Sequence, residues 1–86
     1  MSYSIVLDSR VAKDLAKHEP GVLKRIDAAI RRLGSNPRPA GSKKLQGRIS
    51  EAWRVRVGNY RILYHIRDER REVIIYKIGH RSEVYR

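Results

Sequence analysis

The sequence predicts a small α+β fold with the order β-α-α-β-β-β, in which two N-terminal helices pack on one face of an antiparallel sheet. Three observations lead to this prediction. Apolar residues recur at helical spacing over residues 9–33, they alternate with polar residues after residue 52, and turn sequences separate the later segments. A chain of 86 residues has the size of one domain, so we expect residues 1–86 to form a single domain.

The first strand and the first helix are predicted from residues 3–18. Tyr3–Leu7 is apolar enough for a short strand, and Asp8 suits the position before a helix because its carboxylate can accept hydrogen bonds from first-turn amides. Helical spacing then predicts a helix over residues 9–18 from Val11, Ala12, Leu15 and Ala16. The sequence Glu19-Pro20-Gly21 ends that helix.

A second helix is predicted over residues 21–33. Its apolar stripe consists of Val22, Leu23, Ile26, Ala29, Ile30 and Leu33. Gly34 suits the position just after the helix, because glycine readily adopts the left-handed conformation found there. Residues 34–44 contain two prolines and are predicted to be a loop.

Three further strands are predicted over residues 52–57, 60–67 and 72–78. Gly58-Asn59 is a hairpin turn sequence, and residues 68–71 form a polar turn. Residues 79–86 are expected to leave the last strand as a tail. We expect the core side of these strands to carry Trp53, Val55, Val57, Tyr60, Ile62, Tyr64 and Tyr76.

The charge is strongly one-sided. Twenty Lys and Arg residues stand against nine Asp and Glu residues, a net charge of +11. Residues 1–40 hold eight cations and four acids (+4), whereas residues 41–86 hold twelve and five (+7). Because 41% of the residues are hydrophobic, this is a folded basic domain rather than a basic tail. The excess favours a polyanionic partner such as nucleic acid, and a solvated basic surface is the alternative.

Several kinds of site and location are not expected. The absence of Cys excludes disulfides, cysteine-bound metals and a thiol nucleophile. The three His residues are far apart in the sequence, and the acids do not cluster, so we expect no metal and no cofactor. No apolar run approaches the ~20 residues of a membrane span, and the N-terminus does not resemble a signal peptide. We therefore expect no membrane association and a cytoplasmic location.

A cationic surface is predicted on the side of the sheet away from the helices. If Trp53 faces the helices, strand alternation places Arg54 and Arg56 on the other side. Arg61, across the hairpin, and His65, with the same parity, share that side, although alternating charge is also typical of a solvated strand. The tail can add His80, Arg81 and Tyr85. Arginine binds phosphate through two parallel hydrogen bonds, and aromatic rings stack on unpaired bases.

Such a surface fits single-stranded RNA better than duplex DNA, because neither helix resembles a groove reader. Without an acidic cluster, RNA cleavage would proceed without a metal, by attack of the 2′-hydroxyl on the neighbouring phosphorus. Arginines can neutralise the charge of the pentacovalent transition state, but they are poor bases because the guanidinium stays protonated.

Three motifs in order resemble the RelE/ParE superfamily of type II toxin–antitoxin toxins. They are K-L-x-G at residues 44–47, W-R-x-R-x-G-x-Y-R-x-x-Y at residues 53–64, and G-H-R-x-x-V-Y at residues 79–85. The resemblance covers nearly the whole chain and implies the family's fold, a small sheet with two N-terminal helices.

The resemblance also implies function. RelE-like members cleave mRNA in the ribosomal A site without metal, through 2′-hydroxyl attack, whereas ParE-like members inhibit DNA gyrase. The RelE pattern assigns catalytic roles to Arg54, Arg56, Arg61, Arg81 and Tyr85. The first two positions are often lysine in RelE members, so the arginines here are suited to phosphate binding rather than proton donation.

Further RNA contacts are expected from Lys43, Lys44, Arg48, His65 and His80. His80 can supply acid–base capacity near neutral pH or simply end the last strand. The implied partners are a RelB-like antitoxin, forming a hetero-oligomer with the toxin, and the ribosome with its mRNA. A gyrase inhibitor with the same fold, and an RNA-binding domain without toxicity, are the alternatives.

Overall fold

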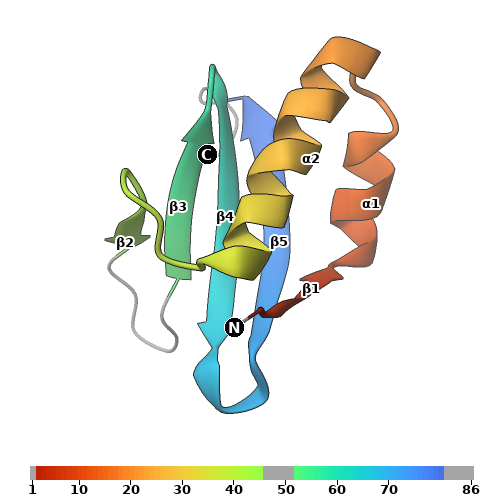
Figure 1. Ribbon diagram of the computed structural model, residues 1–86. Coiled ribbons are helices and arrows are strands. Elements are labelled where there is room, and N and C mark those ends of the chain that lie inside the picture. Colours follow the sequence, from red (N-terminus) through yellow and green to blue (C-terminus); the bar gives the residue numbers. More distant parts are fainter. Residues whose placement is uncertain (1, 46–51, 81–86) are drawn as a thin grey trace.

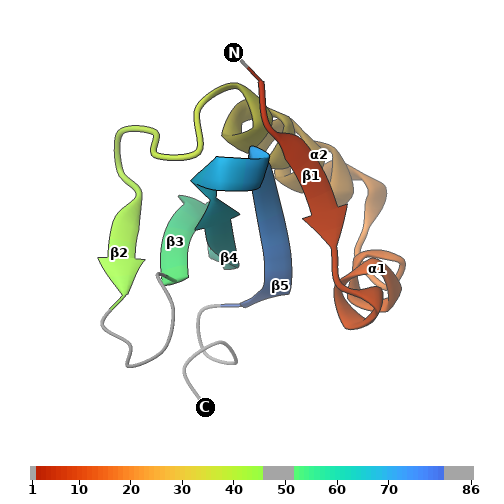
Figure 2. The same ribbon diagram turned by 90° about the horizontal axis from the view of Figure 1, so that it is seen from below.

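The computed structural model describes residues 2–45 and 52–80, and all structural statements below concern those residues. The predicted α+β class is confirmed, with both helices on the same side of the sheet (Figures 1 and 2). The elements are β1 (Ser4–Leu7), α1 (Ser9–Leu15), α2 (Pro20–Ser35), β2 (Lys43–Leu45), β3 (Ala52–Val57), β4 (Tyr60–Arg67), a short 3-10 helix η1 (Asp68–Arg70) and β5 (Glu72–His80).

The sheet has five strands in the order β1-β5-β4-β3-β2, and it differs from the predicted sheet in two ways. First, β1 runs parallel to β5, so the sheet is mixed rather than wholly antiparallel. Second, the predicted loop over residues 34–44 ends in a strand, because β2 pairs antiparallel with Ala52–Arg54 of β3. The short β2 lacks an apolar run, and therefore the sequence carried no strand signal there.

The helix boundaries follow local chemistry. Asp8 caps α1 as predicted, since its carboxylate accepts a hydrogen bond from the Arg10 amide at 2.9 Å. The helix α1 is shorter than predicted, and α2 is longer at both ends, with Pro20 in its first turn, where no amide partner is needed.

Gly34 does not follow α2 but lies buried inside its last turn, which corrects the prediction. The Tyr3 amide donates a hydrogen bond of 2.6 Å to the Gly34 carbonyl. A Cβ atom on residue 34 would lie 3.3 Å from the Tyr3 carbonyl oxygen. Glycine is therefore present because β1 passes close to the helix backbone, and not because the helix ends there.

The core lies between the two helices and the sheet. Its buried residues are Val11, Ile26, Ile30 and Leu33 from the helices and Ile62, Tyr64, Ile66, Val73, Ile75 and Ile78 from β4 and β5. Trp53, Val55 and Val57 of β3 pack against this cluster, as strand alternation predicted. Tyr60, Ile62 and Tyr64 were also placed correctly on the core side.

A β-bulge in the central strand pair changes the placement of Tyr76. The register shifts between Leu63, which pairs with Lys77, and Tyr64, which pairs with Ile75. Tyr76 is thus the extra residue, so Ile75 and Ile78 both enter the core although they are three residues apart. The prediction that Tyr76 lies in the core is wrong for this reason.

A polar cluster ties the N-terminal segment to the far end of the sheet. The Tyr3 hydroxyl donates to Asp68 at 2.6 Å, and the Arg38 guanidinium donates to both Asp68 oxygens at 3.3 and 2.9 Å. The hydrogen bonds from Arg38 and Tyr3 lower the pKa of the Asp68 carboxyl. Arg38 also lies over the Trp53 ring, 5.4 Å from its centroid, and thereby holds the segment after α2 against β3.

Candidate nucleic-acid interface

The face of the sheet away from α1 and α2, called the open face below, carries two cross-strand rows of cations. Residues directly opposite each other in an antiparallel pair point to the same face. One row consists of Lys43, Arg54, Leu63 and Lys77, and the next consists of Arg56, Arg61 and Gly79. These two rows, the cationic rows, contain five cations and no acid.

Arg61 is the buried cation of this face. Only 7% of Arg61 is exposed, and its described hydrogen bond runs from a guanidinium nitrogen to the Tyr60 carbonyl at 3.3 Å. The Arg61 Nε is buried without a hydrogen-bond partner, and among residues 2–45 and 52–80 no carboxylate pairs with Arg61. Burying an uncompensated charge is costly, so the site is suited to bind an anion.

Arg56 adds a second unfavourable charge beside the first. It is the direct cross-strand partner of Arg61, and like charges in that position repel each other. The repulsion between Arg56 and Arg61 is expected to lower the stability of the sheet at this position. A phosphate group between the two guanidinium groups would turn the repulsion into attraction.

The structure brings together only some of the residues predicted from the sequence. Arg54, Arg56 and Arg61 share the open face as predicted, and Lys43 joins them because β2 pairs with β3. His65 lies on the same face, one row beyond the Arg54 row, with Ala52 and Ile74 as its cross-strand partners. The expected sites Arg48, Arg81 and Tyr85 lie outside the described residues.

Two predicted contacts are placed on the other side of the sheet. Lys44 pairs with Trp53, which packs toward the core. His80 pairs with Tyr60 and belongs to β5 rather than to a tail, so the expected departure of the chain at Gly79 is wrong. The Tyr60 ring contacts both His80 and His18, at centroid distances of 5.8 and 5.1 Å. Strand parity thus turns His80 toward the helices and away from the cationic rows.

Sequence reasoning missed two residues of the open face, Tyr76 and Lys77. Tyr76 alternates with the buried Val73 and Ile75, and the bulge then places Lys77 on the same side, because it shifts strand alternation by one residue. The sequence held a weak signal: alternation continued from Val73 and Ile75 would put the charged Lys77 in the core. Tyr76 stacks on His65, and burial raises the pKa of the Tyr76 hydroxyl above its ordinary value.

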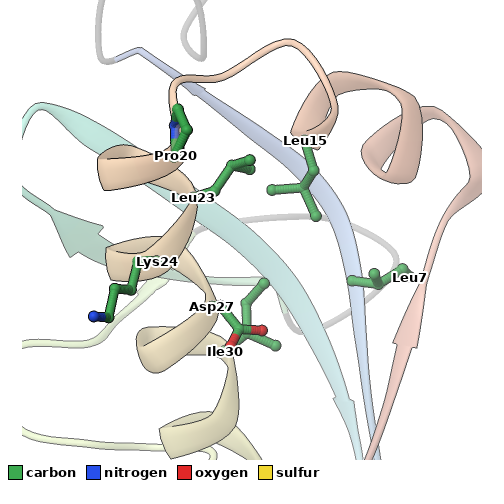
Figure 3. A pocket seen from close by; sticks show the side chains of 7 residues that line it. All are labelled: Leu7, Leu15, Pro20, Leu23, Lys24, Asp27 and Ile30. Carbon is green, nitrogen blue, oxygen red and sulfur yellow. The ribbon is translucent and has the colours of Figure 1, made fainter.

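The helix side carries an apolar pocket of about 500 Å³, shown in Figure 3. Leu7 of β1, Leu15 of α1 and Leu23 of α2 form its walls, with Pro20, Lys24, Asp27 and Ile30 completing the lining. Leu7 is one of two large apolar side chains on β1 that remain 40% exposed.

The described residues define what the open face can do chemically. Within residues 2–45 and 52–80 there is no group of three or more His, Asp or Glu side chains that could hold a metal ion. The same residues include no helix long and apolar enough to cross a membrane. The guanidinium and ammonium groups of the open face are chemically suited to binding phosphate and stabilising developing negative charge.

Comparisons with known proteins identify the family of the chain. Residues 5–85 match the family described as the ParE toxin of the type II toxin–antitoxin system. The chain is 35% identical over 89 residues to RelE1 of Methanocaldococcus jannaschii, covering 100% of this chain and 98% of the relative. It is 32% identical over 87 residues to Toxin RelG of Mycobacterium tuberculosis, covering 100% and 99%.

Solved structures show the same fold. The RelE–RelB complex from Pyrococcus horikoshii contains a chain with a TM-score of 0.84 at 24% identity, covering 98% of this chain and 100% of that one. The isolated E. coli RelE toxin has a TM-score of 0.79 at 26% identity, covering 98% and 92%. The chain therefore belongs to the RelE/ParE superfamily of type II toxin–antitoxin toxins.

Proposed function

We propose that this protein is a RelE-like mRNA endonuclease that cleaves in the ribosomal A site of translating ribosomes, without metal, and thereby inhibits translation. The observation that supports this proposal most directly is the buried Arg61 opposite Arg56. These are two cations on the open face with no described acid between them. The curated relatives bear RelE and RelG names. Such a toxin acts in the cytoplasm, where mRNA is translated.

The protein must assist the reaction in three ways: it must accept one proton, donate another and stabilise the negative charge of the transition state. The 2′-hydroxyl of one nucleotide attacks the adjacent phosphorus and loses its proton, and the 5′-oxygen of the next nucleotide leaves and gains one. The products are a 2′,3′-cyclic phosphate and a 5′-hydroxyl. Arg61 and Arg56 would neutralise the charge that grows on the phosphate oxygens, and Arg54 would hold the neighbouring phosphate.

The proton transfers fall to groups near this face. His65 is the described candidate, and the family pattern adds Tyr85 and Arg81 from the segment outside the described residues. The ribosome would orient the mRNA by holding the codon against the open face.

The test is cleavage of a translated message in a cell-free system with the purified protein, with RNA ends mapped by primer extension. Cuts at A-site codons are expected from the wild type, and Arg61→Met should abolish most of them while preserving side-chain volume. Arg31→Met is the matched control, because Arg31 lies on the exposed face of α2 with 81% of its side chain exposed. Absence of A-site cuts with the wild type would overturn the proposal.

The ParE name of the matching family favours one second candidate, inhibition of DNA gyrase. This activity requires binding to a protein and no cleavage chemistry. A supercoiling assay with purified gyrase separates the two functions. Inhibition that survives Arg61→Met, together with intact mRNA in the translation assay, would favour gyrase as the target.

A RelB-like antitoxin is the proposed partner. The structures of related chains include RelE–RelB complexes from Pyrococcus horikoshii and Methanococcus jannaschii. An acidic segment that folds on binding could cover the cationic rows and neutralise part of the +11 charge. Co-expression with the neighbouring reading frame should yield a stable hetero-oligomer. Elution of the toxin alone at physiological salt would contradict this partner.

A further inference from the structure

His65 and Tyr76 form a stacked pair beside the cationic rows. Their ring centroids are 4.5 Å apart, and the ring planes differ by 21°. His65 comes from β4 and Tyr76 from β5, at the bulge that adds one residue to β5. Both side chains are half-buried and stand outside the core cluster. The pair therefore does not serve to fill the core.

The other residues in the cross-strand row of His65 are apolar, whereas the row beyond it pairs Arg67 with Glu72. Ile74 is the cross-strand partner of His65, and Val6 of β1, 40% exposed, is the partner of Ile74. Lys77 follows Tyr76 directly and belongs to the nearer cationic row. Successive rows on one face are about 7 Å apart, because they are separated by two residues of a strand. The open face thus has a cationic part beside an aromatic and apolar part.

A single-stranded nucleotide has the same division of chemistry. Its phosphate is an anion, and its base offers a flat π-face that stacks on aromatic side chains. Double-stranded nucleic acid hides its bases in the stack, and an acidic peptide offers no series of flat rings. The two neighbouring parts of the open face therefore match an unpaired RNA strand with its phosphates on the cations and a base on the rings.

We propose that the His65–Tyr76 pair is a stacking platform that holds one unpaired RNA base beside the cationic rows, with Tyr76 as its positioning residue. This inference rests on the proposed function. It gives Tyr76 a role in the RNA-binding site. Because a purine presents a larger π-face than a pyrimidine, the platform favours a purine at this nucleotide. Tyr76 touches the base and takes no part in proton transfer.

The experiment measures binding of a 2′-O-methyl RNA hexanucleotide that carries the fluorescent purine 2-aminopurine, whose emission falls on stacking. We expect quenching and tight binding with the wild type. Tyr76→Leu should lose the quenching and about tenfold or more in affinity, the usual effect of removing one stacked base contact. Tyr76→Phe keeps the ring and should bind like the wild type.

A second hexanucleotide with one abasic site closes a double-mutant cycle. The abasic site should weaken binding to the wild type but not to Tyr76→Leu, because the platform is already absent. The salt dependence of binding should stay unchanged in Tyr76→Leu and become shallower in Arg61→Met, since the latter removes a phosphate contact. An equal penalty for the abasic site in wild type and Tyr76→Leu, or no RNA binding by the wild type, would overturn the platform.

The translation assay separates failure of the platform from failure of the proposed function. With Tyr76→Leu we expect weaker preference for purines at cut sites and a raised KM. A-site cuts by Tyr76→Leu with wild-type KM and preference would overturn the platform alone. No cuts by the wild type, with quenching of the hexanucleotide intact, would overturn the proposed nuclease and leave the platform as an RNA-binding feature.

Discussion

Along β4 the side chains alternate between two faces that differ in what surrounds them. On the helix side, Ile62 and Tyr64 are fully buried in an apolar core, and the Tyr64 hydroxyl donates to the Pro37 carbonyl at 2.8 Å. On the open face, Arg61 is nearly as buried but faces another arginine, and His65 stacks on a tyrosine. On the helix side the buried atom without a hydrogen-bond partner is the neutral Trp53 Nε1, whereas on the open face it belongs to the charged Arg61, which has no carboxylate partner among the described residues. We therefore expect the helix side to stabilise the fold and the open face to bind the ligand of the proposed function.

Neighbouring substitutions on opposite faces give the largest contrast. Ile62→Ala should lower the free energy of unfolding by about 2–5 kcal/mol, because it removes buried methyl groups and leaves a cavity. Arg61→Met should leave that free energy unchanged or raise it, since it replaces a buried, uncompensated cation with an apolar side chain of similar length. Urea denaturation of both variants measures the contrast. A loss in Arg61→Met as large as that in Ile62→Ala would mean that Arg61 stabilises the fold.

The rate of A-site cleavage should depend most on the open face, which is the reverse of what we expect for stability. We expect Arg61→Met to reduce the rate of A-site cleavage about 10²–10³-fold, the usual effect of removing one donor to a developing oxyanion. Arg56→Met should have a smaller effect, because Arg56 is exposed and water can replace part of its role. Single-turnover cleavage on programmed ribosomes measures both rates. Equal and small losses of cleavage rate in the two variants would show that the open face contributes only general electrostatic attraction to RNA. A further loss of cleavage at higher salt would support that conclusion.

The smallest effect on stability is expected from the polar cluster of Tyr3, Arg38 and Asp68, which lies away from the centre of either face. The pKa of Asp68 is lowered by hydrogen bonds from Arg38 and Tyr3, from an ordinary value of 3.8. A lowered pKa in the folded state means that the stabilisation is present above pH 3.8 and is lost as the pH falls through the folded pKa. Asp68→Asn should therefore flatten the stability profile below that pH. Parallel acid-unfolding curves for wild type and Asp68→Asn would contradict this role.

Much of the fold could be predicted because β3 and β4 follow strict alternation between turn sequences. Their predicted bounds, residues 52–57 and 60–67, coincide with the observed strands. Two features had no local signal. The parallel pairing of β1 with β5 depends on contacts between the two ends of the chain, and β2 is a strand only because β3 offers it an edge.

The site was predictable to the same extent and for the same reason. The placement of Arg54, Arg56 and Arg61 followed from parity, whereas Tyr76 and Lys77 were missed because the bulge changes parity and leaves only a weak signal in the sequence. The misplacement of His80 came from ending β5 too early. Glycine at position 79 favours a strand end there, but the pairing with β4 extends to His80.

The parallel pairing of β1 with β5 also has a consequence for biosynthesis. The first strand of the chain finds its sheet partner only in the fifth, and Ser4 aligns with Glu72. Such non-local pairing is slow to form and must wait until both segments exist. A nascent chain that is still short of β5 can complete neither the sheet nor the Lys77 end of the cationic rows. The sheet therefore cannot be completed until β5 has been synthesised.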